Sequence, residues 1–137
     1  IMPTLLSLMD LPVPLGVEGK DFSMAVKGEE VRDDGALMMC TGPTAAWGDG
    51  QEWRAFRTRR YKYAVYRSDQ QEFLFDLEND PYERINLAGD LEYRDRLEDL
   101  KRQMYSRMEA VGDHFESNTY YRDHWVEDRI IRHTATI

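Results

Sequence analysis

Basic and aromatic side chains alternate over residues 53–67, and this pattern suits two kinds of binding chemistry. Arginines beside aromatic rings could line the rim of a pocket for an anionic substrate, with tryptophans contacting a sugar or aryl ring. The candidate substrate-rim residues are Trp47, Trp53, Arg54 and Arg57. The same mixture could bind single-stranded nucleic acid, because bases stack on aromatics while cations contact phosphates. A third interpretation, a strand with solvated cations above buried aromatics, explains the alternation most simply.

The other residues that could do chemistry do not form a recognisable site. Cys40 lies in the apolar run ALMMCT and is expected to be buried like a small hydrophobic residue. The acidic run at 76–80 imitates the start of an EF-hand, but Pro81 and Leu87 stand where that loop needs Gly and Glu, so a solvated turn is expected. The histidines are too widely spaced for a local zinc site: His114, His124 and His133. We therefore expect no catalytic residue and no metal ligand in this chain.

Composition restricts the class of protein and its partners. The 137 residues are 42% hydrophobic and 32% charged, which predicts a folded domain with one modest core. The net charge of -8 argues against nucleic acid or an anionic membrane as the main partner. No apolar run approaches the roughly 20 residues of a transmembrane helix. One cysteine excludes an internal disulfide and leaves the localisation open.

Four short segments are expected to form an antiparallel meander. Period-two alternation places Tyr61, Tyr63 and Val65 on one face of the third segment. It likewise groups Phe73 with Phe75 on one face of the fourth. The predicted strands are Ala36–Thr41, Trp53–Thr58, Tyr61–Arg67 and Glu72–Leu77.

A long helix follows the meander. Asp90 is a suitable N-cap for a helix from Leu91 to about Val111, and Gly112 is a natural stop. Its apolar stripe consists of Leu97, Leu100, Met104, Met108 and Val111. The stripe is expected to cover the apolar face of the meander, which gives an α+β fold: a small antiparallel sheet of about four strands packed against a long C-terminal helix.

Three landmarks resemble the C-terminal subdomain of sulfatases, in the alkaline-phosphatase-like superfamily. The first is IMPTLL at 1–6, followed by GVEGKDF at 16–22. The second is RAFRT at 54–58 with RYKY at 60–63, and the third is FDLENDPYE at 75–83 with NLA at 86–88. Because the resemblance begins in mid-motif and lacks an upstream part, the chain is expected to be a fragment of an α/β enzyme. The expected parts are the end of the catalytic domain at 1–30, the sulfatase-like subdomain at 31–112 and a C-terminal arm at 113–137.

The resemblance implies a division of labour within a longer hydrolase. In such enzymes a Cys or Ser, converted to formylglycine, attacks the sulfate ester beside a calcium ion, and both groups lie upstream of the segment seen in this chain. The chain would complete the fold, cover one side of the active-site cleft and have no hydrolase activity alone. Its partner would be the upstream catalytic domain, with self-association when isolated. Two alternatives remain open: a phosphonate monoester hydrolase, and a stand-alone interaction module using the basic-aromatic hairpin.

Overall fold

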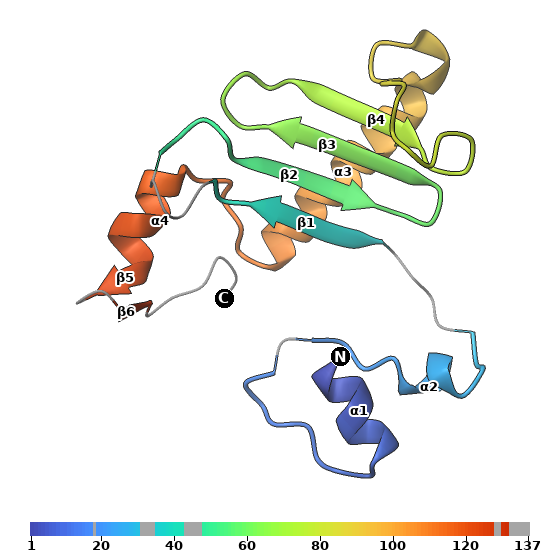
Figure 1. Cartoon of the computed structure of the whole chain (residues 1–137), viewed down its shortest axis with the longest axis vertical. Coiled ribbons are helices and arrows are strands. Elements are labelled where there is room, and N and C mark those ends of the chain that lie inside the picture. The colour runs from blue at the N-terminus through green and yellow to red at the C-terminus, as the bar shows by residue number, and fades with distance from the viewer. Residues whose placement is uncertain (18, 31–34, 43–47, 128–129, 132–137) are drawn as a thin grey trace. The chain divides into compact units, whose positions relative to one another are not determined.

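The computed structural model describes residues 1–17, 19–30, 35–42, 48–127 and 130–131 (Figure 1). The chain divides into two compact units, Ile1–Asp34 and Gly35–Ile137. The predicted three-part division at residues 30 and 112 stays a prediction. Within the described ranges, no helix combines the length and the apolar character needed to cross a membrane.

The first unit consists of two short helices with little buried surface. Helix α1 spans Met2–Leu8, with Pro3 in its first turn, where a missing N–H costs nothing. Helix α2 spans Ser23–Val26, and the Phe22 N–H just before it donates to Thr4 Oγ1 at 3.0 Å. Most apolar side chains of the unit are exposed: Ile1, Met2, Leu5, Leu8, Met9, Leu11, Val13, Leu15, Phe22, Met24 and Val26.

The second unit contains the four-stranded meander (Figure 1). Its strands are β1 (Ala36–Cys40), β2 (Trp53–Arg57), β3 (Tyr61–Tyr66) and β4 (Glu72–Asp76), in that spatial order and each antiparallel to the next. Every predicted strand is confirmed and ends one residue earlier than expected. Side chains close the two tight turns, since Thr58 Oγ1 accepts from the Tyr61 N–H and Asp69 Oδ1 from the Gln71 N–H.

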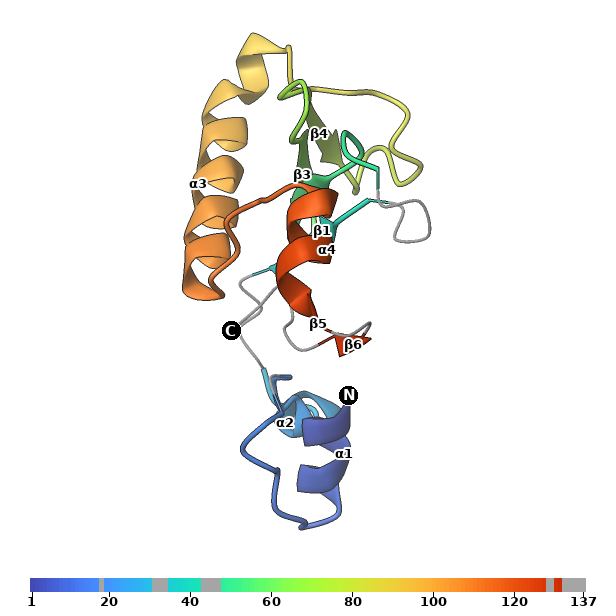
Figure 2. The same cartoon turned by 90° about the vertical axis from the view of Figure 1, so that its left-hand side faces the viewer.

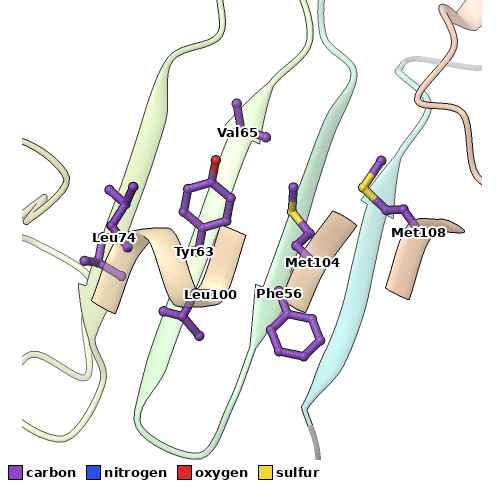
Figure 3. Close-up of a cluster of buried hydrophobic side chains, with 8 residues drawn as sticks. Phe56, Tyr63, Val65, Leu74, Leu100, Met104 and Met108 are labelled. Carbon is purple, nitrogen blue, oxygen red and sulfur yellow. The ribbon is translucent and has the colours of Figure 1, made fainter. Parts of the chain in front are cut away.

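A long helix covers one face of this sheet (Figure 2). A single 3-10 turn, η1 (Leu91–Tyr93), leads into α3 (Arg94–Ala110), and Asp90 caps it by accepting from the Glu92 N–H at 2.9 Å. The stripe residues Leu97, Leu100, Met104 and Met108 are buried against Phe56, Tyr63, Val65 and Leu74 of the sheet. Figure 3 labels these side chains except Leu97. The α+β prediction is therefore confirmed. Beyond α3 lie α4 (Asn118–Trp125) and the two-residue strands β5 (Val126–Glu127) and β6 (Ile130–Ile131).

The sheet carries apolar side chains on both faces. Phe56, Tyr63 and Leu74 are cross-strand neighbours and all lie in the core under α3. Because strand side chains alternate, Phe73 and Phe75 point to the opposite face. The helix thus covers the Leu74 face of β4, and no helix or strand among the described residues of this unit covers the Phe73 face. Sequence alternation grouped Phe73 with Phe75 correctly but did not reveal that the helix covers the other side.

Candidate functional site

The sheet face opposite α3, called the open face, holds a shallow apolar groove of about 370 Å³. In the central row of the register, Ala55 and Ala64 form a low floor between Met38 and Phe73. The complete lining is Met38, Trp53, Ala55, Lys62, Ala64, Tyr66, Phe73 and Phe75. Large side chains around two alanines make a surface that a complementary apolar partner can fill.

Aromatic contacts hold the walls of this groove in a fixed arrangement. Tyr66 packs edge-on against Phe73 with ring centroids 6.0 Å apart, and Phe73 stacks with Phe75 at 6.2 Å. Lys62 lies over the Phe75 ring and forms an ion pair with Glu83, so its charge is compensated at the border of the groove. The open face is therefore a largely apolar, pre-organised surface with a polar edge.

On the other face, a buried polar cluster lies beyond the end of α3. Arg54 is 0% exposed, and its Nε and Nη2 groups donate to the two Asp113 carboxylate oxygens at 2.5 and 2.8 Å. Its remaining N–H groups donate to Tyr121 Oη and to the backbone carbonyls of Cys40 and Trp53. All five guanidinium donors are thereby engaged. The Phe115 ring lies 4.6 Å from the guanidinium carbon and completes the enclosure.

The charge states of the side chains in this cluster favour a structural role over a role in proton transfer. Burial raises the pKa of the Asp113 carboxyl, but hydrogen bonds from Arg54 and the Phe115 N–H outweigh it and hold the pKa below its usual value. Burial raises the pKa of the Tyr121 phenol. At neutral pH the cluster therefore consists of a guanidinium, a carboxylate and a neutral phenol.

Comparisons with known proteins relate this geometry to one family. Residues 1–110 match the family model described as N-sulphoglucosamine sulphohydrolase, C-terminal. The chain belongs to this family. An ulvan-active sulfatase of Formosa agariphila is 34% identical over 122 residues, which are 88% of this chain and 24% of that protein. The chain thus spans about a quarter of the length of this curated relative and is the C-terminal part of a sulfatase.

Solved structures agree on the fold. A 2-O GAG sulfatase superimposes with a TM-score of 0.69 and 25% identity, covering 80% of this chain and 24% of that one. A phosphonate monoester hydrolase from Silicibacter pomeroyi superimposes with a TM-score of 0.62 at 22% identity, covering 83% of this chain and 25% of that one. The second match shows a shared fold alone.

The candidate rim residues of this sulfatase C-terminal part are not brought together. Trp53 and Arg57 lie on the open face, four residues apart along β2, whereas Arg54 points to the opposite face. The rim role expected for Arg54 does not fit its geometry, because an anionic substrate would have to displace Asp113 from a fully buried guanidinium. Trp47 lies outside the described residues.

The remaining sequence predictions have mixed outcomes. Cys40 is half-buried rather than in the core, and its Sγ accepts from the Gly42 N–H at 3.4 Å. The acidic run is not simply a solvated turn: Asp76 is 3% exposed, and hydrogen bonds from Arg60 lower its pKa to about 2. His114 and His124 are exposed, and His133 lies outside the described residues.

Metal binding has no support in the described part of the chain. Among those residues, no three His, Cys, Asp or Glu side chains are grouped to hold an ion. The resemblance places the calcium ion in the upstream part of the enzyme, and calcium binding by the full-length protein stays a prediction.

Sequence reasoning missed the role of Asp113. Its partner Arg54 is 59 residues away, so no local spacing connects them. The available signal was an arginine in phase with Phe56 on the core side of β2, which needs a buried counter-charge from somewhere in the chain.

Proposed function

We propose that the full-length protein hydrolyses sulfate esters of a polysaccharide, and that this chain docks its open face on the upstream catalytic domain. In that position it completes the fold and covers one side of the active-site cleft. Two of the similar proteins named above are an ulvan-active sulfatase and a 2-O GAG sulfatase, which supports a sulfated polysaccharide as the substrate class.

The observation that carries the docking proposal is the open face itself. It is an apolar groove on a sheet whose other face is already covered by α3. Half-buried apolar side chains that line a groove on an otherwise uncovered sheet face are suited to contact a partner. The relatives have about three-quarters of their length outside the matched region, which supplies an obvious occupant within the same polypeptide.

The first unit supports the same arrangement. Leu5, Leu8 and Met24 are exposed in a unit that buries only Pro3 and Ser23 among its helical residues. Side chains of this kind gain roughly 1.5–3 kcal/mol each when a neighbour buries them fully. We infer that the upstream domain provides this neighbour too.

The catalytic groups would then belong to the upstream domain. A formylglycine nucleophile and a calcium ion are proposals for the full-length enzyme. Among the described residues of this chain, no group of His, Cys, Asp or Glu side chains would hold the metal ion. The contribution of this chain would be to exclude water from one side of the cleft and to hold the rim in place.

The interaction-module alternative has less support because the basic hairpin is largely occupied within the chain. Arg54 is paired with Asp113, Arg60 with Asp76 and Lys62 with Glu83. Arg67 Nε donates to the Phe115 carbonyl at 2.7 Å. Only part of the predicted cationic surface is left for an acidic partner, which disfavours nucleic acid.

A comparison of substrates distinguishes the proposed sulfatase activity from the phosphonate monoester hydrolase alternative. The full-length protein would be assayed for inorganic sulfate released from ulvan and glycosaminoglycan oligosaccharides, and for hydrolysis of an aryl phosphonate monoester. We expect kcat/KM for one sulfate ester to exceed that for the phosphonate by about a hundredfold, a difference of about 2.7 kcal/mol in transition-state binding. A preference for the phosphonate would contradict the proposal.

A further inference from the structure

Helix α4 has its first N–H groups capped by a distant segment. Asp49 Oδ1 accepts from the Thr119 N–H and Oδ2 from Thr119 Oγ1, each at 2.8 Å. Glu52 Oε1 accepts from the Asn118 N–H at 2.7 Å. The opening N–H groups of a helix lack partners within the helix and need an acceptor. Here two carboxylates 66 and 70 residues earlier in the chain provide it.

The contacts also run in the opposite direction, from α4 to the earlier segment. Asn118 Nδ2 donates to the Gly48 carbonyl at 3.2 Å. Glu52 is 0% exposed, and its second oxygen accepts from the Gly50 N–H at 2.8 Å. The segment Gly48–Glu52 is thereby tied to the start of α4 at three points, immediately before β2 begins at Trp53.

A second anchor holds the turn between α3 and α4. Phe115 has a φ of 56°, a left-handed conformation that costs energy for a residue with a side chain. Its N–H donates to Asp113 Oδ1 at 3.0 Å, and its carbonyl accepts from Arg67 Nε. The turn is therefore fixed to β2 through Arg54 and to the end of β3 through Arg67.

We propose that residues 113–121 form a strap that fixes Gly48–Glu52 and, through it, the Trp53 end of the open face. Asp49 and Glu52 are then positioning residues for the docking face. The strap begins after the family match, which ends at residue 110. The effect on catalysis rests on the proposed function, whereas the strap itself does not.

Amide hydrogen exchange on the full-length protein tests the strap with Asp49→Ala. Two variants serve as controls. Asp49→Asn keeps an acceptor oxygen for the Thr119 N–H. Asp69→Ala removes a comparable exposed carboxylate, whose Oδ1 accepts from the Gln71 N–H in the β3–β4 turn.

We expect Asp49→Ala to speed exchange at Gly48–Glu52 and Asn118–Tyr121 by about tenfold, with β3 unchanged. Asp49→Asn should stay close to the wild type, and Asp69→Ala should leave both segments unchanged. Equal exchange in Asp49→Ala and the wild type would overturn the strap, as would the same acceleration in Asp69→Ala.

Kinetics on the same variants test the positioning role. Asp49→Ala should raise KM for a sulfated oligosaccharide several-fold while kcat stays within twofold, and Asp49→Asn should restore KM. An unchanged KM alongside faster exchange would overturn the positioning role. A wild-type enzyme without sulfate-ester hydrolysis would overturn the proposed function, while the exchange result would still decide the strap.

Discussion

Replacing Asp113 with alanine is expected to destabilise the second unit by about 3–5 kcal/mol, because Arg54 would be left buried without its counter-charge. Both side chains are 0% exposed, so water cannot replace the lost carboxylate. The free energy of opening can be measured in the full-length protein from hydrogen exchange at the most protected β3 amides. The pKa of Asp113 is lower in the folded state than in the unfolded chain, where an Asp has a pKa of about 3.9. The contribution of Asp113 to the free energy of unfolding is therefore fully present at pH values above about 3.9. That contribution is lost as pH falls through the folded pKa.

A second substitution separates the unpaired charge from simple loss of packing. Arg54→Met in the Asp113→Ala background should recover part of the stability, because the buried cation is then removed. Asp123→Ala is the matched control, since Asp123 is exposed and pairs with Arg122 at the surface; its cost should stay below about 1 kcal/mol. A cost that small for Asp113→Ala would show that the cluster is solvated in solution.

Replacing Phe73 with aspartate is expected to abolish most activity of the full-length enzyme. Phe73 forms a wall of the open-face groove, and docking would bury the new carboxylate against an apolar surface without a partner. The side chain is half-buried in the chain itself and lies outside the α3 core, so the second unit should still fold. We expect kcat/KM to fall by at least about a hundredfold, which corresponds to about 2.7 kcal/mol. Limited proteolysis should at the same time release an intact C-terminal fragment.

In the isolated chain, Phe73→Asp is expected to reduce self-association rather than to impair function. The wild-type chain should self-associate through its open face and the exposed residues of α1, and Phe73→Asp should shift it toward monomer in sedimentation. Tyr82→Asp is the control, because Tyr82 is 83% exposed and lies outside the groove. Full activity of the Phe73→Asp enzyme would refute docking through the open face.

The sequence predicts the elements that are marked by local signals, such as turn residues, or by a periodic pattern of apolar residues. The strands follow from alternation and turn residues, and α3 follows from the stripe that includes Leu100 and Met104. The sequence predicts only an arm over residues 113–137, because α4 is anchored by Asp49 and Glu52, far away in the chain, rather than by an apolar stripe. Arg54 is a rim candidate in the sequence because arginines alternate with aromatics along the hairpin, and no local spacing links it to Asp113, 59 residues away.

We propose that this chain supports catalysis in a sulfatase without supplying the reacting groups. The most direct test measures inorganic sulfate released from an aryl sulfate by the full-length protein and by the isolated chain, side by side and with calcium present. We expect release by the full-length protein and none by the chain. Turnover by the chain alone would contradict the claim; its survival in Cys40→Ala would indicate another catalytic group, and its loss would identify Cys40 as the nucleophile.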